Sequence, residues 1–283
     1  MDAATFISDA SQFCRSMEEE FEGPPGARRH RPSGSRLRAL VAVHLYGRFA
    51  DMDALLKLAA REGISLVEDA AQALSARGSG GFAGAMGDLG VISFYPTKNL
   101  GGAGDGGMVL TSDAGHAERL RLLRVHGMDA GGRVILEGAI NARMGELQAA
   151  VLNAKLARLG AWTAARCRVA GHYAQALGPV AEGGRISLPQ PGEAGAHVWH
   201  QYVIRVPDIR DRVREGMKAE GVETALFYPR GLHRQPCFAA YASRPLPECD
   251  LAAAEVLSLP MRPSLSVQEV EAVAGALARA LEV

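Results

Sequence analysis

The strongest constraint on the fold is an apolar run, a helical segment and a second apolar run in direct succession. Residues 37–47, LRALVAVHLYG, are short, apolar and rich in β-branched side chains. Residues 51–63 have the apolar spacing of a helix and close on Gly63, and residues 64–74 open as a second buried strand. Such a unit places its two strands in parallel, with a right-handed crossover. The pattern predicts an α/β fold.

Further elements extend this pattern along the chain. Residues 87–96 and 106–113 predict a third and a fourth strand, and residues 114–124 and 144–177 predict helices. After a Pro/Gly-rich stretch the pattern changes, and the predicted elements are a strand at 200–206, a helix at 208–221, a strand at 222–229 and a helix at 266–281. We therefore expect a large domain at residues 1–160 and a small α+β domain at residues 161–283. The loop-like segment 22–36 is interpreted as a solvated connection.

Composition restricts the class of ligand. The chain has 283 residues, and its 31 lysines and arginines balance 31 aspartates and glutamates, which argues against a nucleic-acid or anionic membrane surface. No apolar run approaches the roughly 20 residues that cross a bilayer. The four cysteines form no C-x-x-C pair and no segment resembles a signal peptide, so we expect a reducing, cytoplasmic compartment. These features are typical of a protein that acts on small molecules.

One lysine stands out in the stretch FYPTKNLGGAGDGG, residues 94–107. Asp69, Ser93 and Lys98 follow neighbouring predicted strands, whose carboxyl ends form the ligand crevice of an open parallel sheet. Lys98 is either a solvated cation or an amine that forms a Schiff base with a carbonyl cofactor, and Asp69 is the carboxylate that a pyridinium nitrogen would need. The glycines allow close backbone approach to a ring or a phosphate. They do not form a dinucleotide site, because a strand and not a helix follows them.

Several segments in order along the chain carry a family resemblance: VEDAAQALSA, GDLGVISFYPTKNLGG, INARMGELQAAVL, HVWHQYVIRV and YPRGLHRQP. From about residue 37 to the C-terminus the sequence resembles the DegT-type (DegT/DnrJ/StrS-like) sugar aminotransferases. The resemblance implies pyridoxal 5'-phosphate (PLP) as cofactor and fold type I, with a mainly parallel sheet in a partial large domain and a small α+β C-terminal domain. It also implies transfer of an amino group from glutamate or glutamine to a keto group of a nucleotide-linked sugar or related cyclitol.

The resemblance assigns roles to individual residues. Lys98 is similar to the Schiff-base lysine, which after release serves as general base between the donor Cα and C4′ of the cofactor. Asp69 resembles the carboxylate that pairs with the pyridine nitrogen, although a strand-end aspartate can also cap a following helix. Gln72 is similar to the residue near the phenolic oxygen, and Ser93 to a phosphate ligand. Asn141, in an N-x-R segment, resembles the asparagine that reaches the phosphate in the neighbouring subunit, which implies a homodimer with shared sites.

The substrate side is less defined. Tyr228, His233 and His126 lie in segments that resemble substrate-binding loops, as do His44 and Tyr46. Histidines and tyrosines at strand ends are equally compatible with a structural role. For these five residues, contact with the substrate and a structural role therefore both remain possible interpretations.

One part of the family pattern has no counterpart in this sequence. Family members have, upstream of the region matching Met1, a helix and a G-[ST]-x-A loop that hold the cofactor phosphate, followed by an aromatic residue that covers the ring. Two hypotheses follow: an active aminotransferase, or a truncated, catalytically impaired or regulatory relative. Lys98 argues against the family's dehydratase branch, in which histidine replaces the lysine. Four strands alone would leave edges and apolar surface bare, so we expect a dimer with weak cofactor affinity or an aggregation-prone chain.

Overall fold

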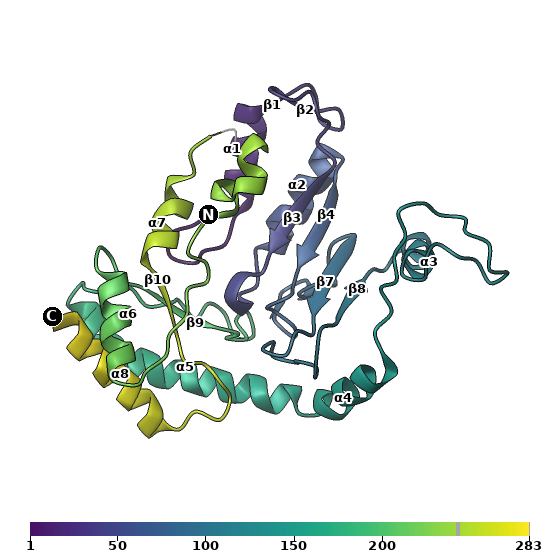
Figure 1. Ribbon diagram of the computed structural model, residues 1–283. Coiled ribbons are helices and arrows are strands. Elements are labelled where there is room, and N and C mark those ends of the chain that lie inside the picture. Colours follow the sequence, from purple (N-terminus) through teal and green to yellow (C-terminus); the bar gives the residue numbers. More distant parts are fainter. Residues whose placement is uncertain (242–243, 283) are drawn as a thin grey trace.

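A four-stranded sheet forms the centre of the computed structural model, which describes residues 1–241 and 244–282 (Figure 1). Its strands are β3 (Ala39–Val43), β4 (Ser65–Asp69), β7 (Leu89–Ser93) and β8 (Gly107–Leu110), in the order β3-β4-β7-β8. The first three are parallel, and β8 is antiparallel to β7. The four predicted strands and the mainly parallel sheet are confirmed. In the register, Asp69 pairs with Val43 on one side and Val91 on the other.

Helix α2 (Met52–Glu62) makes the crossover between β3 and β4. The Asp51 carboxylate accepts a hydrogen bond from the backbone N–H of Ala54 at the N-terminus, and Gly63 closes the helix in the left-handed conformation, at φ 60°. Leu55, fully buried, packs with Leu40 and Leu66 in one apolar cluster. Helix α1 (Ala10–Glu20), which the sequence analysis did not predict, adds Met17 to that cluster.

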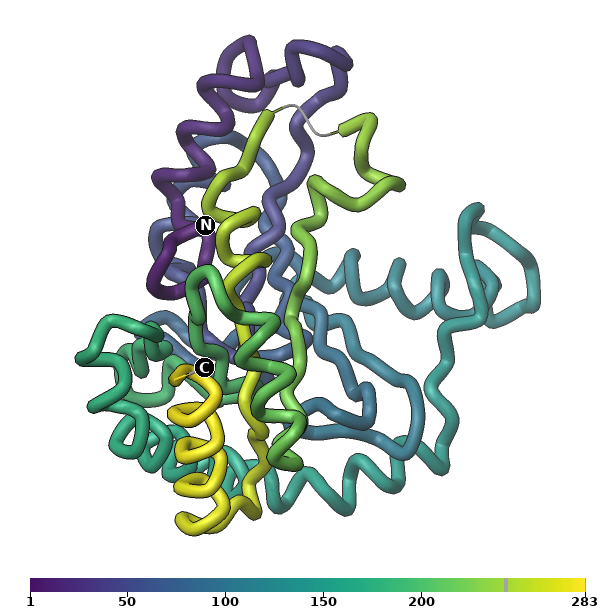
Figure 2. The backbone as a smooth tube through the Cα atoms, turned by 60° about the vertical axis from the view of Figure 1, so that its left-hand side comes forward, coloured from purple at the N-terminus to yellow at the C-terminus, as the bar shows by residue number. Residues whose placement is uncertain are grey.

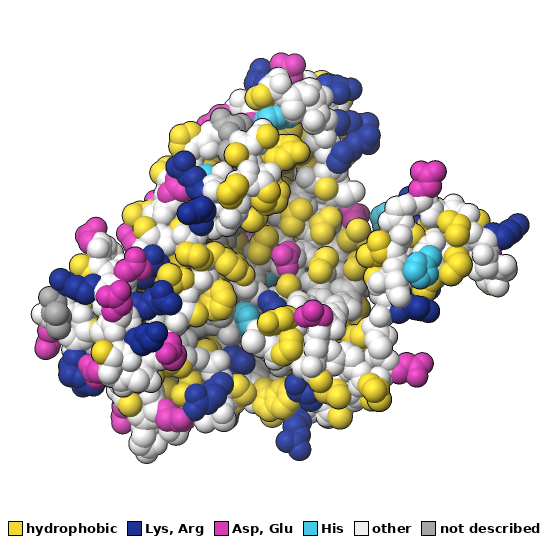
Figure 3. Space-filling view, viewed as in Figure 1, with side chains coloured by type: hydrophobic (Ala, Val, Ile, Leu, Met, Phe, Trp, Pro, Cys, Tyr) yellow, Lys and Arg dark blue, Asp and Glu magenta, His cyan; other side chains and the backbone are white. Residues whose placement is uncertain are grey.

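The two faces of the sheet differ in exposure because side chains alternate along each strand. On the face toward α2, side chains such as Leu40, Leu66 and Ile92 are buried. On the opposite face Val41 is 52% and Val109 45% exposed among the described residues. Figure 3 shows hydrophobic side chains gathered over these strands in the hollow of the molecule. The described chain therefore presents an apolar sheet face whose rim carries Asp69.

The middle of the chain contains helices α3 (Ala114–Leu123), α4 (Glu146–Leu156) and α5 (Leu159–Glu182). The segment 144–177, predicted as helical, forms two helices, because residues 157–158 separate α4 from α5. Leu152 of α4 and Leu159 of α5 pack in the same buried cluster, so the apolar spacing runs on across the break. Residues 124–145, which we call the arm, extend away from the sheet after α3 (Figure 1).

The C-terminal part surrounds a second sheet. Strands β9 (Tyr202–Arg205) and β10 (Val256–Leu259) are antiparallel, and α6 (Arg210–Ala219) and α8 (Val267–Glu282) pack with α5 beside them (Figure 2). The predicted strand at 222–229 is wrong: only Ala225 bridges to Ser258. Residues 228–229 instead line a cavity. Helix α7 (Pro247–Glu255) and strand β10 were not predicted. The division of the chain into two domains at residue 160 stays a prediction.

Shorter elements complete the chain. They are β1 (Phe21–Glu22), β2 (Arg29–His30), β5 (Arg77–Gly78), β6 (Gly81–Phe82), η1 (Leu45–Gly47), η2 (Leu232–Arg234) and η3 (Pro236–Tyr241). The segment 22–36 is mostly exposed, although Arg28 forms an ion pair with the buried Glu62 at 2.6 Å. Every helix that the structure describes is too short or too polar to cross a bilayer.

Candidate functional site

A cavity of about 590 Å³ opens at the carboxyl ends of the parallel strands. Asp69, Gln72 and Lys98 line it from the side of the large sheet, and Tyr228 and His233 line it from the C-terminal part. Much of the remaining wall is apolar, formed by side chains that include Val41, Val43, Leu45, Leu232, Leu246 and Val256. The structure thus brings together Lys98 and six of the other predicted cofactor and substrate residues: Asp69, Gln72, His44, Tyr46, Tyr228 and His233.

Asp69 ends β4 and points into this cavity. Its Oδ1 accepts a hydrogen bond from the backbone N–H of Ala71 at 3.0 Å, and within the described part of the chain Oδ2 has no hydrogen-bond donor. The alternative role as a helix cap is not realised, because a turn and not a helix follows β4. One carboxylate oxygen is therefore available to a ligand.

Lys98 lies in a tight turn after β7. Its backbone N–H bonds to the carbonyl of Tyr95 at 2.8 Å, and a Cβ added to Gly101 would lie 2.1 Å from the carbonyl oxygen of Pro96. Only glycine therefore permits the turn at position 101. Burial lowers the pKa of the half-buried Lys98 amine, and the charge of Asp69 opposes this shift. A larger fraction of the amine is consequently neutral than for a solvated lysine.

Asn99 ties this turn to the segment that leads into the second sheet. Its Nδ2 donates to the carbonyl of Val198 at 3.1 Å, and its Oδ1 accepts from Nδ1 of His200 at 3.2 Å. Burial and the charges of Lys98 and Arg166 lower the pKa of His200 to about 3, so its imidazole is neutral. The sequence analysis missed Asn99 and His200. The signal that could have identified them is that each is a polar residue in otherwise buried surroundings.

Helix α4 holds the glycine-rich loop behind Lys98. Gln148 accepts from the N–H of Ala103 at 2.7 Å and donates to the carbonyl of Asp105 at 3.3 Å, while the amine of Lys155 donates to the carbonyl of Gly101. A Cβ on Gly102 would lie 2.8 Å from the Gln148 side chain. The glycines therefore permit a close contact between the loop and α4.

Gln72 joins three segments of the cavity wall. Its Oε1 accepts from the N–H of Tyr46 at 2.6 Å, and its Nε2 donates to the hydroxyl of Tyr228 at 3.2 Å. The hydroxyl of Tyr46 in turn donates to the carbonyl of Phe227. Tyr228 keeps 52% of its surface exposed. In this structure Gln72 positions Tyr228, which leaves the tyrosine ring accessible to a ligand.

His44 is fully buried and bonds to Glu68, also fully buried. Its Nε2 lies 3.0 Å from Oε2 of Glu68, and its Nδ1 accepts from the N–H of Ala50. Glu68 further accepts from the backbone N–H groups of the loop at residues 84–87. The pair supports the cavity wall from behind, and in this structure His44 has a structural partner.

Three predicted site residues do not line the cavity. The hydroxyl of Ser93 accepts from the N–H of Tyr95 at 3.3 Å. Asn141 and His126 are exposed on the arm, where Asn141 accepts from Nε of Arg143 at 3.1 Å. Within one chain, these three residues therefore do not share the cavity with Lys98.

The chain belongs to the DegT/DnrJ/EryC1/StrS aminotransferase family, which matches residues 32–278. It is 40% identical over 246 residues to the UDP-N-acetyl-3-dehydro-α-D-glucosamine 3-aminotransferase of Acidithiobacillus ferrooxidans, covering 87% of this chain and 65% of that protein. It is 42% identical over 236 residues to the "Pleiotropic regulatory protein" of Geobacillus stearothermophilus, covering 83% and 63%. The chain thus spans less than two thirds of the length of these curated relatives.

Solved structures show the same fold. An aminotransferase of this family from Brucella abortus superposes with a TM-score of 0.86 at 31% identity, over 99% of this chain and 71% of that one. DesV of S. venezuelae, solved with a ketimine intermediate, has a TM-score of 0.85 at 37% identity, over 100% and 71%. The predicted family and its PLP-dependent fold are confirmed.

The residues present fit the cofactor of this family. The cavity offers a half-buried amine whose pKa is lowered, at Lys98, and a carboxylate with an available oxygen, at Asp69. An aldehyde requires the first and a pyridine nitrogen the second. Both groups line one space, which is the requirement for contact with a single molecule.

Proposed function

We propose that the protein is a PLP-dependent aminotransferase that moves an amino group from glutamate or glutamine to the keto group of a nucleotide-linked sugar or related cyclitol. The observation that carries this proposal is that Lys98 and Asp69 line one cavity at the ends of neighbouring strands. The names of its relatives support the sugar class, since they include transaminases of UDP- and dTDP-linked sugars.

Bound PLP supplies an electron-accepting ring that stabilises negative charge on the donor Cα. The carboxylate of Asp69 would keep the ring nitrogen protonated by raising the pKa of that nitrogen. The amine of Lys98 would hold the cofactor and, once free, would take the proton from the donor Cα and deliver it to C4′ of the cofactor. Its lowered pKa favours this role because only the neutral amine accepts a proton.

Covalent trapping tests the proposal. The purified protein is incubated with PLP, reduced with borohydride, digested and analysed by mass spectrometry. We expect the adduct on the peptide that contains Lys98, and its loss in Lys98→Ala. Lys57→Ala, which changes an exposed lysine of α2, is the matched control and should retain the adduct. Retention of the adduct by Lys98→Ala would show that the assignment is wrong.

We further propose a homodimer in which Asn141 completes the site of the partner subunit. The arm and the start of α4 support this, because they expose apolar side chains: Val134 is 68%, Ile140 64% and Leu147 87% exposed. Lys98→Ala and Asn141→Ala chains, each inactive alone, should regain transaminase activity when they are co-expressed, since a mixed dimer holds one intact site. No recovery in isolated mixed dimers would contradict shared sites.

A catalytically impaired or regulatory protein is the second candidate. Two relatives favour it by name: the "Pleiotropic regulatory protein" and the "Erythromycin biosynthesis sensory transduction protein EryC1". The absorption spectrum of the PLP-treated protein separates the candidates, because an aminotransferase changes its spectrum when glutamate or glutamine is added and an impaired relative does not. The cytoplasmic location stays a prediction.

A further inference from the structure

A second cavity of about 380 Å³ adjoins the cavity that holds Lys98 and Asp69. The two cavities share four lining residues, Pro229, Arg230, Gly231 and Ala253. The second is also lined by Arg210 and Arg234, with Asp250 as the acidic residue of its wall. We call this space the arginine annex. It has three guanidinium groups and one carboxylate, whereas the larger cavity has a mainly apolar wall.

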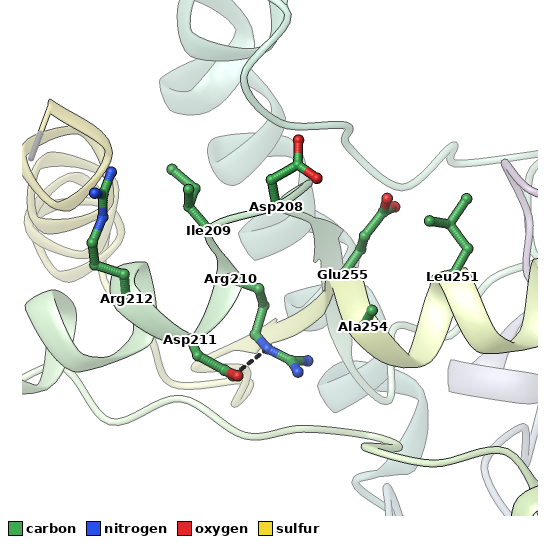
Figure 4. A pocket seen from close by; sticks show the side chains of 8 residues that line it. All are labelled: Asp208, Ile209, Arg210, Asp211, Arg212, Leu251, Ala254 and Glu255. Carbon is green, nitrogen blue, oxygen red and sulfur yellow. Dashed lines mark hydrogen bonds and ion pairs between the residues drawn. The ribbon is translucent and has the colours of Figure 1, made fainter.

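Two of the three arginines are engaged with the protein. Nε of Arg210 pairs with Asp211 at 2.6 Å (Figure 4), and its Nη1 donates to the carbonyls of Ala253 and Val256. Its residue surface is only 8% exposed, so it anchors the wall. Arg234 donates from two nitrogens to the carboxylate of Asp250, at 3.0 and 2.6 Å. These contacts compensate the charge of both guanidinium groups.

Arg230 differs from both. It is exposed and makes no hydrogen bond or ion pair with any residue that the structure describes. It lines both cavities, so its side chain lies at their junction. Of the other basic groups that line the larger cavity, His233 bonds to Asp250 at 3.0 Å and His44 to Glu68. The proposed function assigns the amine of Lys98 to the cofactor. Arg230 is therefore the uncompensated cation at the substrate end of the site within the described chain.

The segment that carries Arg230 is held in place from α7. Asp250 bonds to both His233 and Arg234, which follow Arg230 within four residues. The guanidinium of Arg234 lowers the pKa of Asp250, so the carboxylate stays ionised at neutral pH and the contacts persist. The position of Arg230 thus does not depend on its own contacts, and its fork of donors remains available.

We propose that Arg230 binds the diphosphate of the nucleotide-linked substrate in the arginine annex, while the sugar lies in the larger cavity beside Lys98. This inference rests on the proposed function. A planar guanidinium donates two parallel hydrogen bonds to phosphate oxygens, and a diphosphate brings the negative charge that the annex lacks. The apolar wall beside Lys98 suits the ring of a deoxygenated or acylated sugar better than an anion. Arg230 therefore selects nucleotide-linked sugars over free sugars.

Isothermal titration of the PLP-treated protein with UDP, dTDP and uridine tests the inference. Loss of a charge-assisted phosphate contact should weaken UDP and dTDP binding about tenfold or more in Arg230→Ala, and leave uridine binding unchanged. The UDP affinity of Arg230→Lys should lie between those of the unchanged protein and Arg230→Ala, because lysine keeps the charge but not the two parallel donors of the guanidinium group. Arg212→Ala is the matched control, since Figure 4 shows that Arg212 of the same domain points away from Arg210.

Equal UDP affinity in Arg230→Ala and Arg212→Ala would overturn the inference, as would equal affinity of the unchanged protein for UDP and uridine. Thermal unfolding of both variants should match that of the unchanged protein, because neither side chain has a partner among the described residues that would be lost. The measurement does not require amino transfer. If trapping at Lys98 fails while Arg230→Ala still weakens UDP binding, only the proposed reaction is rejected. If trapping succeeds while Arg230→Ala leaves UDP binding unchanged, only the role of Arg230 is rejected.

Discussion

Glu68→Gln should destabilise the large sheet strongly, although Glu68 is not in the cavity. Its carboxylate is fully buried and accepts four hydrogen bonds. Oε2 faces Nε2 of His44 at 3.0 Å and the N–H of Gly84 at 2.9 Å, and Oε1 faces the N–H groups of Met86 and Gly87, each at 2.7 Å. All four partners are hydrogen-bond donors. The amide nitrogen of glutamine is also a donor, so in Glu68→Gln it would face two of these groups without accepting a hydrogen bond from either.

His44 cannot relieve this conflict by exchanging its proton between the ring nitrogens, because its Nδ1 accepts from the N–H of Ala50 at 3.0 Å. A hydrogen bond to a charged group contributes about 1.5–3 kcal/mol, so the loss of two predicts about 3–6 kcal/mol. With a urea slope of about 3 kcal/mol per molar, the unfolding midpoint should fall by about 1–2 M.

Urea unfolding followed by circular dichroism measures this change. Glu118→Gln, an exposed residue of α3, is the matched control and should leave the midpoint unchanged. A loss below about 1 kcal/mol for Glu68→Gln would show that the carboxylate does not organise the wall, since even one lost bond of this kind exceeds that value.

The pH dependence gives a second readout of Glu68. Burial raises the pKa of its carboxyl, but hydrogen bonds from His44 and from the backbone outweigh it, and the folded-state pKa lies below the ordinary 4.5. The stabilisation is therefore fully present above pH 4.5 and is lost as pH falls through the folded-state pKa. The difference in free energy of unfolding between the unchanged protein and Glu68→Gln should therefore shrink on acidification. A difference that stays constant with pH would refute an ionised carboxylate at Glu68.

Three further outcomes are expected. Asp69→Asn should still trap PLP but slow the half-reaction with glutamate severely in stopped-flow absorbance, because an amide does not hold the ring nitrogen protonated; an unchanged rate would refute the pairing. Gly101→Ala should lower the thermal midpoint and the covalent PLP yield, since its Cβ would lie 2.1 Å from a backbone oxygen, whereas Gly145→Ala, with open space, should not. Asn99→Ala should cost about 1–3 kcal/mol in urea unfolding because a buried carbonyl loses its donor, and no loss would contradict the link to His200.

The sequence by itself determined the core of the sheet and the placement of Lys98 and Asp69 at one crevice. Strand, helix and strand follow each other within residues 37–74, and their apolar spacing and the terminal Gly63 are local properties. The carboxyl ends of parallel strands meet at one edge of the sheet. The side chains that follow these strands therefore share a crevice, whatever the packing of the rest of the chain.

Local pattern was insufficient where packing decided the structure. The apolar spacing of residues 144–177 continues across the break between α4 and α5, because leucines on both sides enter one cluster. Residues 222–229 have the composition of a strand, yet they leave the sheet after Ala225 and form a cavity wall. In both cases the neighbours that decide the conformation are distant in sequence.

Tertiary structure alone decided which polar groups are engaged and which are available. Asn99 meets His200 across 101 positions of sequence, and Gln72 meets Tyr228 across 156, so neither pair has a local signature. Arg230 and Arg234 are four positions apart and are chemically alike in the sequence. The placement of α7 gives Arg234 a carboxylate, whereas Arg230 has none among the residues that the structure describes. The charge balance of a side chain depends on the groups that the whole fold brings within hydrogen-bonding distance.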